Sequence, residues 1–377
     1  MRNVWLRFAE LLGAWVLILT IAAGCSGGDP ISTTQSDISI STTISAPDSI
    51  GPAPSSPSAT TQVSAPQVSA DPDQEGYAAP IWDDFDYGEA AFGSDLADIA
   101  ATGAEWVTLV PTWYQSSPES SVIYPERPGR TATDEALVAA IVEAQALGLE
   151  VMLKPHVDLV DGGYRGGIEP ASTQQWFESY GEVIVGYARL AEQHDIPQFV
   201  VGTELAGTSS DTAPWRDLIA GVRQVFSGSL TYAANHDEFP NVQFWDDLDF
   251  IGVDAYFPLA EQPTTDLGRL TVAWDPIIDE LGKVARAFER SIVFTEVGYP
   301  SQEGASVQPY NPSLSTVVSN DEQEAALRAM LSSVDGQTWF GGFHWWMWFT
   351  GESPGERALG YMPQGKPAGA ILMDRWE

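Results

Sequence analysis

The sequence predicts an α/β fold, a closed (β/α)8 barrel formed by one domain, on three observations. From residue 77 onward, apolar runs of about five to seven residues alternate with segments of helical period. Eight such runs fit into roughly 300 residues, which suits a barrel whose usual size is about 250 residues. The runs are almost continuously apolar, as in parallel strands that are covered on both faces.

The elements follow one another in regular order. The predicted strands are residues 79–82, 106–111, 150–154, 198–202, 230–234, 250–253, 291–295 and 341–346. The predicted helices are residues 93–102, 133–147, 173–194, 213–226, 243–247, 275–290, 321–334 and 367–375, and Thr133 and Ser319 suit helix N-termini. An open, doubly wound sheet is the alternative, but the glycine-rich phosphate loop that it normally carries after its first strand does not follow Trp82.

The first 24 residues have the pattern of an export signal. A basic start with Arg2 and Arg7 precedes an apolar run over residues 11–23, and small residues lead directly into Cys25. This ending resembles a bacterial lipobox, which implies that residues 1–24 are removed and that Cys25 is acylated. The resemblance therefore predicts an extracytoplasmic protein anchored to the cell membrane by lipid. A transmembrane anchor is the alternative, although the apolar run is shorter than the roughly 20 residues that a spanning helix needs.

Residues 25–75 differ in composition from the rest of the chain. They are rich in Ser, Thr, Pro, Ala and Gln and have no sustained hydrophobic period. Such a segment does not bury enough apolar surface to fold, so we expect a disordered tether. The folded domain is then expected over residues 76–377.

Composition excludes some partners. The net charge is −35 with only 17 Lys and Arg, which argues against a nucleic acid and disfavours polyanionic substrates. Cys25 is the only cysteine, so there is no internal disulfide. The 14 Trp residues suit stacking on sugar rings, although large barrels also bury many Trp. We expect a monomer that needs neither a metal nor another cofactor.

Polar and aromatic residues gather where the predicted strands end. In a barrel of this type, the chemistry lies at the carboxyl ends of the strands. Three of the four histidines, His156, His236 and His344, fall at these ends or within the eighth strand. This concentration predicts a carbohydrate cleft, and its candidate binding residues are Trp113, Lys154, His156, Asp158, Asn235, His236, Tyr256 and Trp346.

Two glutamates stand out within this group of strand ends. Glu204 directly follows the fourth strand and Glu296 directly follows the seventh, each flanked by small residues. Cleavage of a glycosidic bond needs two carboxyl groups, one that protonates the leaving oxygen and one that attacks the anomeric carbon or activates water. The pair predicts a glycoside hydrolase.

The motifs around these glutamates resemble those of a known family. Residues 201–205 (VGTEL) and 294–299 (FTEVGY) are similar to glycoside hydrolase family 113, as are residues 154–158 (KPHVD) and 252–256 (GVDAY). The resemblance covers nearly the whole domain. It implies a TIM barrel and a retaining endo-β-1,4-mannanase whose substrate is a polysaccharide or oligosaccharide.

Roles for single residues follow from the same resemblance. It implies that Glu296 is the nucleophile and Glu204 the general acid and base. Tyr256 would donate a hydrogen bond to Glu296, and Trp346 would form the floor under the sugar. Lys154, His156 and Asp158 would hold sugar hydroxyls, with a structural ion pair as the alternative for Lys154. The related clan usually has Asn where Thr203 stands, so the group that binds the sugar 2-hydroxyl stays open, with Asn235 and His236 as candidates.

Three other functions fit parts of the sequence. A metal-dependent barrel hydrolase usually has a His-x-His motif after its first strand, and residues 83–86 here read DDFD. A non-catalytic oligosaccharide-binding lipoprotein would share the anchor and the tether but needs no paired glutamates. A retaining hydrolase of another β-linked glycan has the same chemistry as a mannanase.

Overall fold

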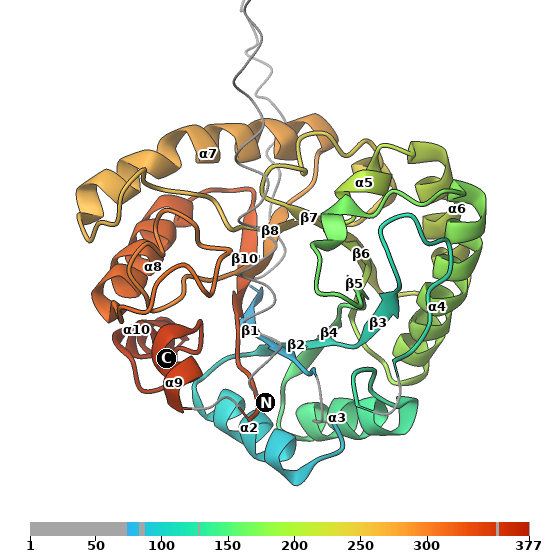
Figure 1. Ribbon diagram of the computed structural model, residues 1–377, viewed down its shortest axis with the longest axis horizontal. Helices are drawn as coiled ribbons and strands as arrows, with labels where there is room; N and C mark the ends of the chain where they lie inside the picture. The colour runs from blue at the N-terminus through green and yellow to red at the C-terminus, as the bar shows by residue number, and fades with distance from the viewer. Residues whose placement is uncertain (1–73, 83–86, 127–128, 352–353, 377) are drawn as a thin grey trace, which may run out of the picture. The chain divides into compact units, whose positions relative to one another are not determined.

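The computed structural model describes residues 74–82, 87–126, 129–351 and 354–376. Within them, eight parallel strands close into a barrel in the order β1-β10-β9-β8-β7-β6-β4-β2, and helices surround it (Figure 1). The predicted (β/α)8 barrel is confirmed. The predicted signal peptide, the acylation site Cys25 and nearly all of the predicted tether lie outside the described residues. No helix in the described ranges has the length and apolar character needed to cross a membrane.

The barrel strands match the predicted ones closely, with one exception. They are β1 (Gln74–Pro80), β2 (Trp106–Val110), β4 (Glu150–Leu153), β6 (Gln198–Thr203), β7 (Ser229–Asn235), β8 (Ile251–Asp254), β9 (Ile292–Val297) and β10 (Phe340–Trp346).

The exception is β1, which we predicted over residues 79–82. The strand starts at Gln74, inside the segment assigned to the tether. The prediction placed its start too late because the first residues of the strand are polar and do not continue the apolar pattern. These residues pair with β2 on one side and β10 on the other. Gly76 is needed for the pairing, since a Cβ there would lie 1.9 Å from the carbonyl oxygen of Trp106.

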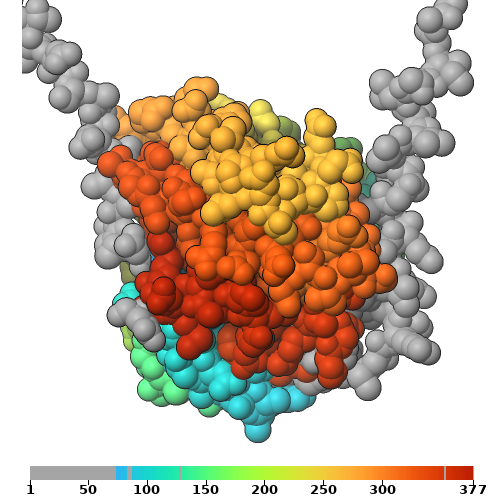
Figure 2. All heavy atoms as spheres, turned by 90° about the vertical axis from the view of Figure 1, so that its left-hand side faces the viewer, coloured from blue at the N-terminus to red at the C-terminus, as the bar shows by residue number. Residues whose placement is uncertain are grey.

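The larger helices also follow the sequence pattern. They are α2 (Ala90–Ala101), α3 (Asp134–Ala146), α4 (Thr173–Gln193), α6 (Thr212–Arg223), α7 (Leu267–Phe288), α8 (Asn320–Val334) and α10 (Pro367–Trp376), and the short segment predicted at 243–247 is the 3-10 helix η2 (Trp245–Asp247). Figure 2 shows the side of the barrel domain on which α7, α8 and α10 follow one another.

Helix α7 begins earlier than residue 275, where we predicted its start. Asp266 is the N-cap, and its side chain accepts a hydrogen bond from the backbone N–H of Arg269 at 3.2 Å. As a result, Pro276 lies inside the helix. The predicted caps Thr133 and Ser319 are confirmed, because each side chain accepts a backbone N–H of its own first turn.

Short elements that the sequence did not predict come after the carboxyl ends of barrel strands, and two of them form a second sheet. Strands β3 (Thr112–Gln115) and β5 (His156–Leu159) continue β2 and β4 and pair with each other in parallel. The other short elements are the 3-10 helix η1 (Arg165–Gly167) and the helices α5 (Ala206–Ser209) and α9 (Pro354–Leu359).

Most of the tryptophans that the structure describes serve the core. Trp176, Trp215, Trp245, Trp274 and Trp345 are fully buried. The rings of Trp176 and Tyr180, for example, stack with centroids 4.6 Å apart between α4 and the barrel. The high Trp content is therefore mainly a packing feature, and only a few rings remain to line a cleft.

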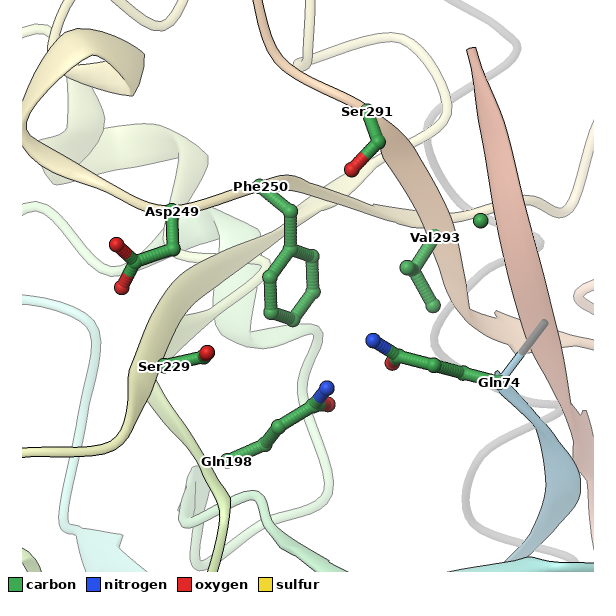
Figure 3. A pocket seen from close by; sticks show the side chains of 8 residues that line it. Gln74, Gln198, Ser229, Asp249, Phe250, Ser291 and Val293 are labelled. Atoms are coloured by element: carbon green, nitrogen blue, oxygen red, sulfur yellow. The ribbon is translucent and has the colours of Figure 1, made fainter. Parts of the chain in front are cut away.

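The amino-terminal end of the barrel carries a small polar pocket. Gln74, Gln198 and Ser229 are the first residues of β1, β6 and β7, and their side chains point into the pocket (Figure 3). Among the described residues, the side-chain oxygens of Gln74 and Gln198 have no hydrogen-bond partner. The pocket lies at the opposite end from the carboxyl ends of the strands, where barrels of this kind place their chemistry.

A buried glutamate fastens the long segment between β9 and α8. Glu322, in the first turn of α8, accepts hydrogen bonds from the N–H of Gly304 at 2.9 Å and from the N–H and hydroxyl of Ser306 at 2.9 and 2.6 Å. Each of its two carboxylate oxygens thus accepts at least one hydrogen bond, and the residue is only 2% exposed. This carboxylate therefore holds the segment between β9 and α8 against the start of α8.

We predict that Glu322→Gln lowers the free energy of unfolding by about 2 kcal/mol, because an amide N–H would then face a buried N–H donor. Denaturant titration measures the change. The control is Glu324→Gln on the same helix, which removes an exposed ion pair with Arg328 and should change the free energy by less than about 0.5 kcal/mol. Equal losses in the two variants would contradict the fastening role.

Candidate active site

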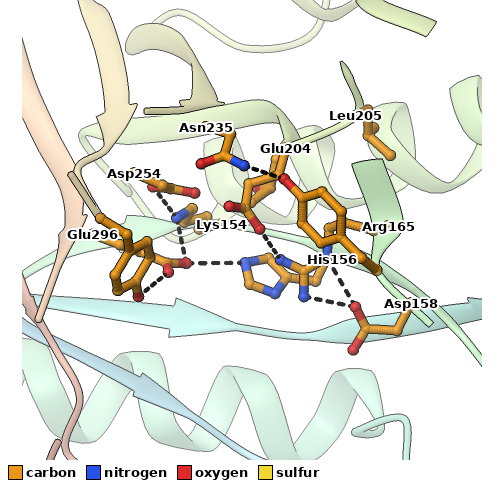
Figure 4. Close-up of polar contacts among 12 residues, drawn as sticks. Lys154, His156, Asp158, Arg165, Glu204, Leu205, Asn235, Asp254 and Glu296 are labelled. Atoms are coloured by element: carbon orange, nitrogen blue, oxygen red, sulfur yellow. Dashed lines mark hydrogen bonds and ion pairs between the residues drawn. The ribbon is translucent and has the colours of Figure 1, made fainter. Parts of the chain in front are cut away.

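Glu296 lies near the end of β9, and three side chains in or shortly after other strands surround its carboxylate. Oε1 is 2.6 Å from Nζ of Lys154, and Oε2 accepts the hydroxyl of Tyr256 at 2.7 Å. Nε2 of His156 lies 3.5 Å from Oε1. The residue is only 3% exposed. Both oxygens are thus oriented by donors, and the bond from Tyr256 is the one expected from the sequence (Figure 4).

Lys154 links Glu296 to a second buried carboxylate. It follows β4, its side chain is fully buried, and Nζ also lies 2.8 Å from Oδ1 of Asp254 at the end of β8. The hydroxyl of Thr295 donates to the same oxygen at 2.8 Å. Lys154 is therefore an ion-pair partner of two carboxylates, as in the structural alternative considered for it.

The surroundings of Glu296 keep it ionised. Burial on its own would raise the pKa of this carboxyl, but the positive charge of Lys154 and the contacts with Lys154 and His156 outweigh burial and lower the pKa to about 2. Burial and the positive charge of Arg165 lower the pKa of His156 to about 4, so this imidazole is neutral at pH 7. Glu296 is thus a carboxylate throughout the physiological pH range.

Glu204 directly follows β6 in a sharp turn. Its φ is 51°, in the left-handed region that few side chains adopt, and its N–H donates to the carbonyl oxygen of Ala233 at 2.8 Å. The next N–H, of Leu205, donates to the hydroxyl of Tyr232 at 2.8 Å. Thr203, where the related clan has Asn, is buried at 1% exposure. These bonds fix the direction in which the Glu204 side chain leaves the strand.

Glu204 differs from Glu296 in its affinity for a proton. Burial raises the pKa of Glu204 to about 8, helped by the negative charges of Asp254 and Glu296, while the positive charge of Arg165 acts in the opposite direction. Nη1 of Arg165 lies 3.1 Å from Oε2. At pH 7 this carboxyl therefore holds its proton while Glu296 does not.

Arg165 was missed by the sequence reasoning, which looked only at strand ends. It lies in η1, inside the glycine-rich run 162–167, and no pattern of charge or period marks it. Its Nε and Nη2 lie 2.9 and 2.6 Å from Oδ1 of Asp158 on β5. Asp158, which we expected to hold a sugar hydroxyl, therefore holds this guanidinium in the structure.

Aromatic rings lie beside Glu296. Trp346 at the end of β10 stacks on His156, with ring centroids 6.2 Å apart and planes at 16°. The ring of Trp82, after β1, approaches Trp346 with centroids 5.8 Å apart. Both tryptophans are only partly buried. An accessible apolar surface therefore adjoins the buried charges.

A second aromatic group adjoins Glu204. Asn235 at the end of β7 donates a hydrogen bond from Nδ2 to the hydroxyl of Tyr164, and its Oδ1 lies 2.6 Å from Nδ1 of His236. The ring of His236 stacks on Tyr310, with centroids 6.1 Å apart and planes at 11°. Tyr164 and Tyr310 are each 44% exposed. The predicted residues Asn235 and His236 are thus brought together with two tyrosines that the sequence reasoning did not select.

Two other residues of the predicted rim have structural contacts. Nε1 of Trp113 donates to the hydroxyl of Tyr187 at 2.8 Å, and its ring packs against the core. His344 lies inside the barrel, where Nδ1 is 2.8 Å from Oγ1 of Thr108 on β2, and burial lowers its pKa to about 3. In the described part of the chain, no cluster of three or more His, Cys, Asp or Glu is arranged to hold a metal ion.

The arrangement has the parts needed to break a glycosidic bond. One buried carboxylate, Glu296, is ionised and is contacted by Lys154, whereas a second buried carboxyl, Glu204, is protonated and is contacted by Arg165 (Figure 4). The two carboxyl groups also influence each other electrostatically. Accessible aromatic rings lie on either side. This is the chemistry expected of a pair of glycosidase carboxyl groups.

Comparison with known proteins agrees with this chemistry. The model of Glycoside Hydrolase Family 113 matches residues 83–364. A search of curated proteins found no match.

Solved structures give the same relationship. The GH113 β-mannanase AaManA from Alicyclobacillus acidocaldarius, in complex with ManMIm, is 29% identical and has a TM-score of 0.74, with 81% of this chain and 97% of that chain covered. A further GH113 β-1,4-mannanase is 27% identical with a TM-score of 0.73, covering 81% and 99%. A β-glucuronidase from Ruminococcus gnavus shares only the fold, at 15% identity, a TM-score of 0.55, and 81% and 49% coverage. The chain belongs to glycoside hydrolase family 113 and is a glycoside hydrolase.

Proposed function

We propose that the protein hydrolyses β-1,4-mannan with retention of configuration, with Glu296 as nucleophile and Glu204 as acid and base. The observation that carries the proposal is the different set of donors at two buried carboxyl groups. Lys154 and Tyr256 contact Glu296, and the positive charge of Lys154 helps to lower its pKa to about 2. Glu204, which Arg165 contacts through one nitrogen, has its pKa raised by burial to about 8. Two carboxyls with such different environments divide the roles of nucleophile and acid between them.

In the first step, Oε2 or Oε1 of Glu296 forms a bond to the anomeric carbon while the glycosidic C–O bond breaks. The proton of Glu204 goes to the leaving oxygen, so the departing sugar is released as an alcohol. Glu296 then carries no charge because it is an ester. The loss of this neighbouring negative charge lowers the pKa of Glu204, which is now ionised and ready to act as a base.

In the second step, Glu204 takes a proton from water, and the hydroxide oxygen bonds to the anomeric carbon. The ester bond to Glu296 breaks, and both carboxyl groups return to their first states. Lys154 and Tyr256 assist both steps, since they hold the carboxylate in one orientation and stabilise the charge that it regains.

The aromatic groups support a saccharide as substrate. We assign the surface of Trp346 and Trp82 to the sugar that forms the ester, since Trp346 stacks on His156 beside Glu296. His156 is neutral and lies next to the nucleophile, so it suits a hydroxyl of that sugar, whereas Lys154 and Asp158 are occupied by ion pairs. Mannan as the polymer follows from the β-mannanases to which the chain is similar.

Endo action is supported by the group around Tyr310. The general acid protonates the leaving group, so the part of the polymer that departs extends past Glu204. Tyr164, Asn235, His236 and Tyr310 form an accessible wall there, linked to Glu204 through the Tyr164–Arg165 segment. Two exposed tyrosine rings are suited to bind the departing sugars of a chain cut in its interior.

Lipid anchoring at Cys25 is part of the proposal and rests on the sequence alone. The tether expected over residues 25–75 would let the enzyme reach a polymer outside the membrane.

Chemical rescue tests the two carboxyl roles. We predict that Glu296→Gly loses at least about 10⁴-fold in kcat, and that added azide restores turnover of an activated aryl mannoside by giving the inverted glycosyl azide. Glu204→Ala with azide should give the retained product, because azide then replaces water in the second step. Product stereochemistry by NMR distinguishes the two. Glu150→Ala, at the opposite end of β4, is the control and should keep full activity.

Full activity of Glu296→Gly on mannan would refute the assignment of the nucleophile. Oligosaccharide binding without turnover by the native protein would favour the alternative of a non-catalytic binding lipoprotein.

We predict that Tyr310→Ala lowers kcat/KM on mannan about tenfold but leaves an aryl β-mannoside nearly unaffected, since only the polymer has departing sugars to lose their stacking partner. Val317→Ala, at an exposed position of the same segment, is the matched control. Kinetics on mannan, glucomannan, xylan and cellulose oligomers define the polymer in the same experiment. Equal losses on both substrate types would argue against the assigned wall.

We predict that Cys25→Ser in the full chain abolishes incorporation of a radiolabelled fatty acid and moves the protein from the membrane to the soluble extracytoplasmic fraction. Ser32→Ala, within the same predicted tether, should change neither. Membrane retention of the Cys25→Ser protein without label would instead indicate that the apolar run is a transmembrane anchor.

A further inference from the structure

Arg165 forms an asymmetric bridge between two carboxyl groups. Its Nε and Nη2 both approach Oδ1 of Asp158, at 2.9 and 2.6 Å, whereas only Nη1 reaches Glu204, at 3.1 Å. The three side chains are 11–17% exposed. The guanidinium thus turns two of its donors, at the shorter distances, to Asp158 and offers one to Glu204.

The backbone on either side of Arg165 is closely packed. A Cβ on Gly166 would lie 2.3 Å from the ring of Tyr164, and a Cβ on Gly207 would lie 2.3 Å from the carbonyl oxygen of Ile168, next to η1. Asp158 is itself fixed, because β5 pairs with β3 through the register Tyr114 to Asp158. Packing therefore holds the backbone of η1, whereas the two hydrogen bonds to Asp158 set the direction of the guanidinium.

We propose that Arg165 is a positioning residue and that Asp158, by holding it, limits how strongly Arg165 favours the ionised form of Glu204. The inference rests on the proposed role of Glu204 as acid and base.

The chemistry explains why such a limit is useful. A guanidinium free to pair fully with Glu204 would keep this carboxyl ionised and leave it without a proton for the leaving group. Without Arg165, the buried carboxyl would hold its proton too firmly to serve as a base in the second step. A charge shared with Asp158 lies between these extremes.

Several other groups contribute to the electrostatic environment of Glu204, and all of them would stay in place when Arg165 or Asp158 is changed. They are Lys154, Tyr164, Asp254, Glu296 and Tyr361. Among them, burial raises the pKa of Asp254 to about 7, so Asp254 titrates in the same pH range as Glu204 in every variant. Substitutions at Arg165 and Asp158 remove charges of opposite sign, so they change the electrostatic environment of Glu204 in opposite directions.

The expected pH dependence follows from the sign of each change. Glu204 must be protonated in the free enzyme, so kcat/KM falls as the pH rises through its pKa of about 8. Arg165→Met removes a positive charge, raises this pKa and moves the alkaline fall to higher pH by about one unit. Asp158→Asn removes a negative charge, frees Arg165 for Glu204 and moves the fall to lower pH. Arg165→Lys keeps the charge and should move the fall less than Arg165→Met.

The experiment measures kcat/KM on mannan oligosaccharides from pH 4 to about 10 for the wild type and the three variants. Arg375→Gln is the matched control, because Arg375 also bridges two carboxylates, Glu75 and Asp335, but lies in α10 beside the start of β1. It should leave the alkaline limb unmoved even if it lowers the thermal stability. Thermal unfolding of every variant confirms that each is folded.

A second measurement does not need activity. The ¹³C NMR titration of glutamate-labelled protein, with the Glu204 signal identified by its absence in Glu204→Gln, reports the pKa of Glu204 directly in each variant. Opposite shifts for Arg165→Met and Asp158→Asn support the inference. Shifts in the same direction, or no shift in either folded variant, overturn it. A wild type that titrates as expected but hydrolyses no β-glycan would overturn the proposed function and leave the inference standing.

Discussion

The buried ion pairs of Lys154 are the interaction on which the rest of the site depends. The Lys154 side chain has no exposed surface, and its Nζ lies 2.8 Å from Asp254 and 2.6 Å from Glu296. Loss of either partner would leave a buried charge without full compensation, which typically costs about 3–5 kcal/mol. These three residues come from or directly follow β4, β8 and β9, so their contacts form only when the barrel closes. The contacts that keep Glu296 ionised despite its burial therefore depend on closure of the barrel.

This coupling also explains how two glutamates on one barrel acquire different protonation. Both are buried, and burial alone would raise the pKa of each. Glu296 receives the ammonium of Lys154 and the hydroxyl of Tyr256, whereas Glu204 receives one arm of a guanidinium that is mainly engaged by Asp158. The barrel thus buries both carboxyl groups, and the hydrogen-bond donors and positive charges that reach each of them cause the difference between their pKa values.

The sequence predicted the parts that depend on local pattern. Apolar runs located seven of the eight barrel strands, and the glutamates that follow the fourth and seventh were visible as strand-end residues. The start of β1 escaped notice because Gln74, Glu75 and Gly76 carry no apolar signal. Arg165 was not predicted because its position depends on how a loop packs. The pairing of Lys154 with both Asp254 and Glu296 depends on distances across the barrel, which the hydrophobic pattern of a sequence does not encode.

At Glu204, the backbone conformation that would be most stable and the side chain that the proposed chemistry needs call for different residues. A residue with φ of 51° is held in a conformation that glycine adopts freely and that strains other side chains by about 1 kcal/mol or more. The chain nevertheless has glutamate there, with its carboxyl moved out of water. Glycine at this position would relieve the backbone strain but would remove the carboxyl that we propose as the proton donor. On the proposed role of Glu204, the conformational cost of this turn is accepted in exchange for a buried carboxyl at the site.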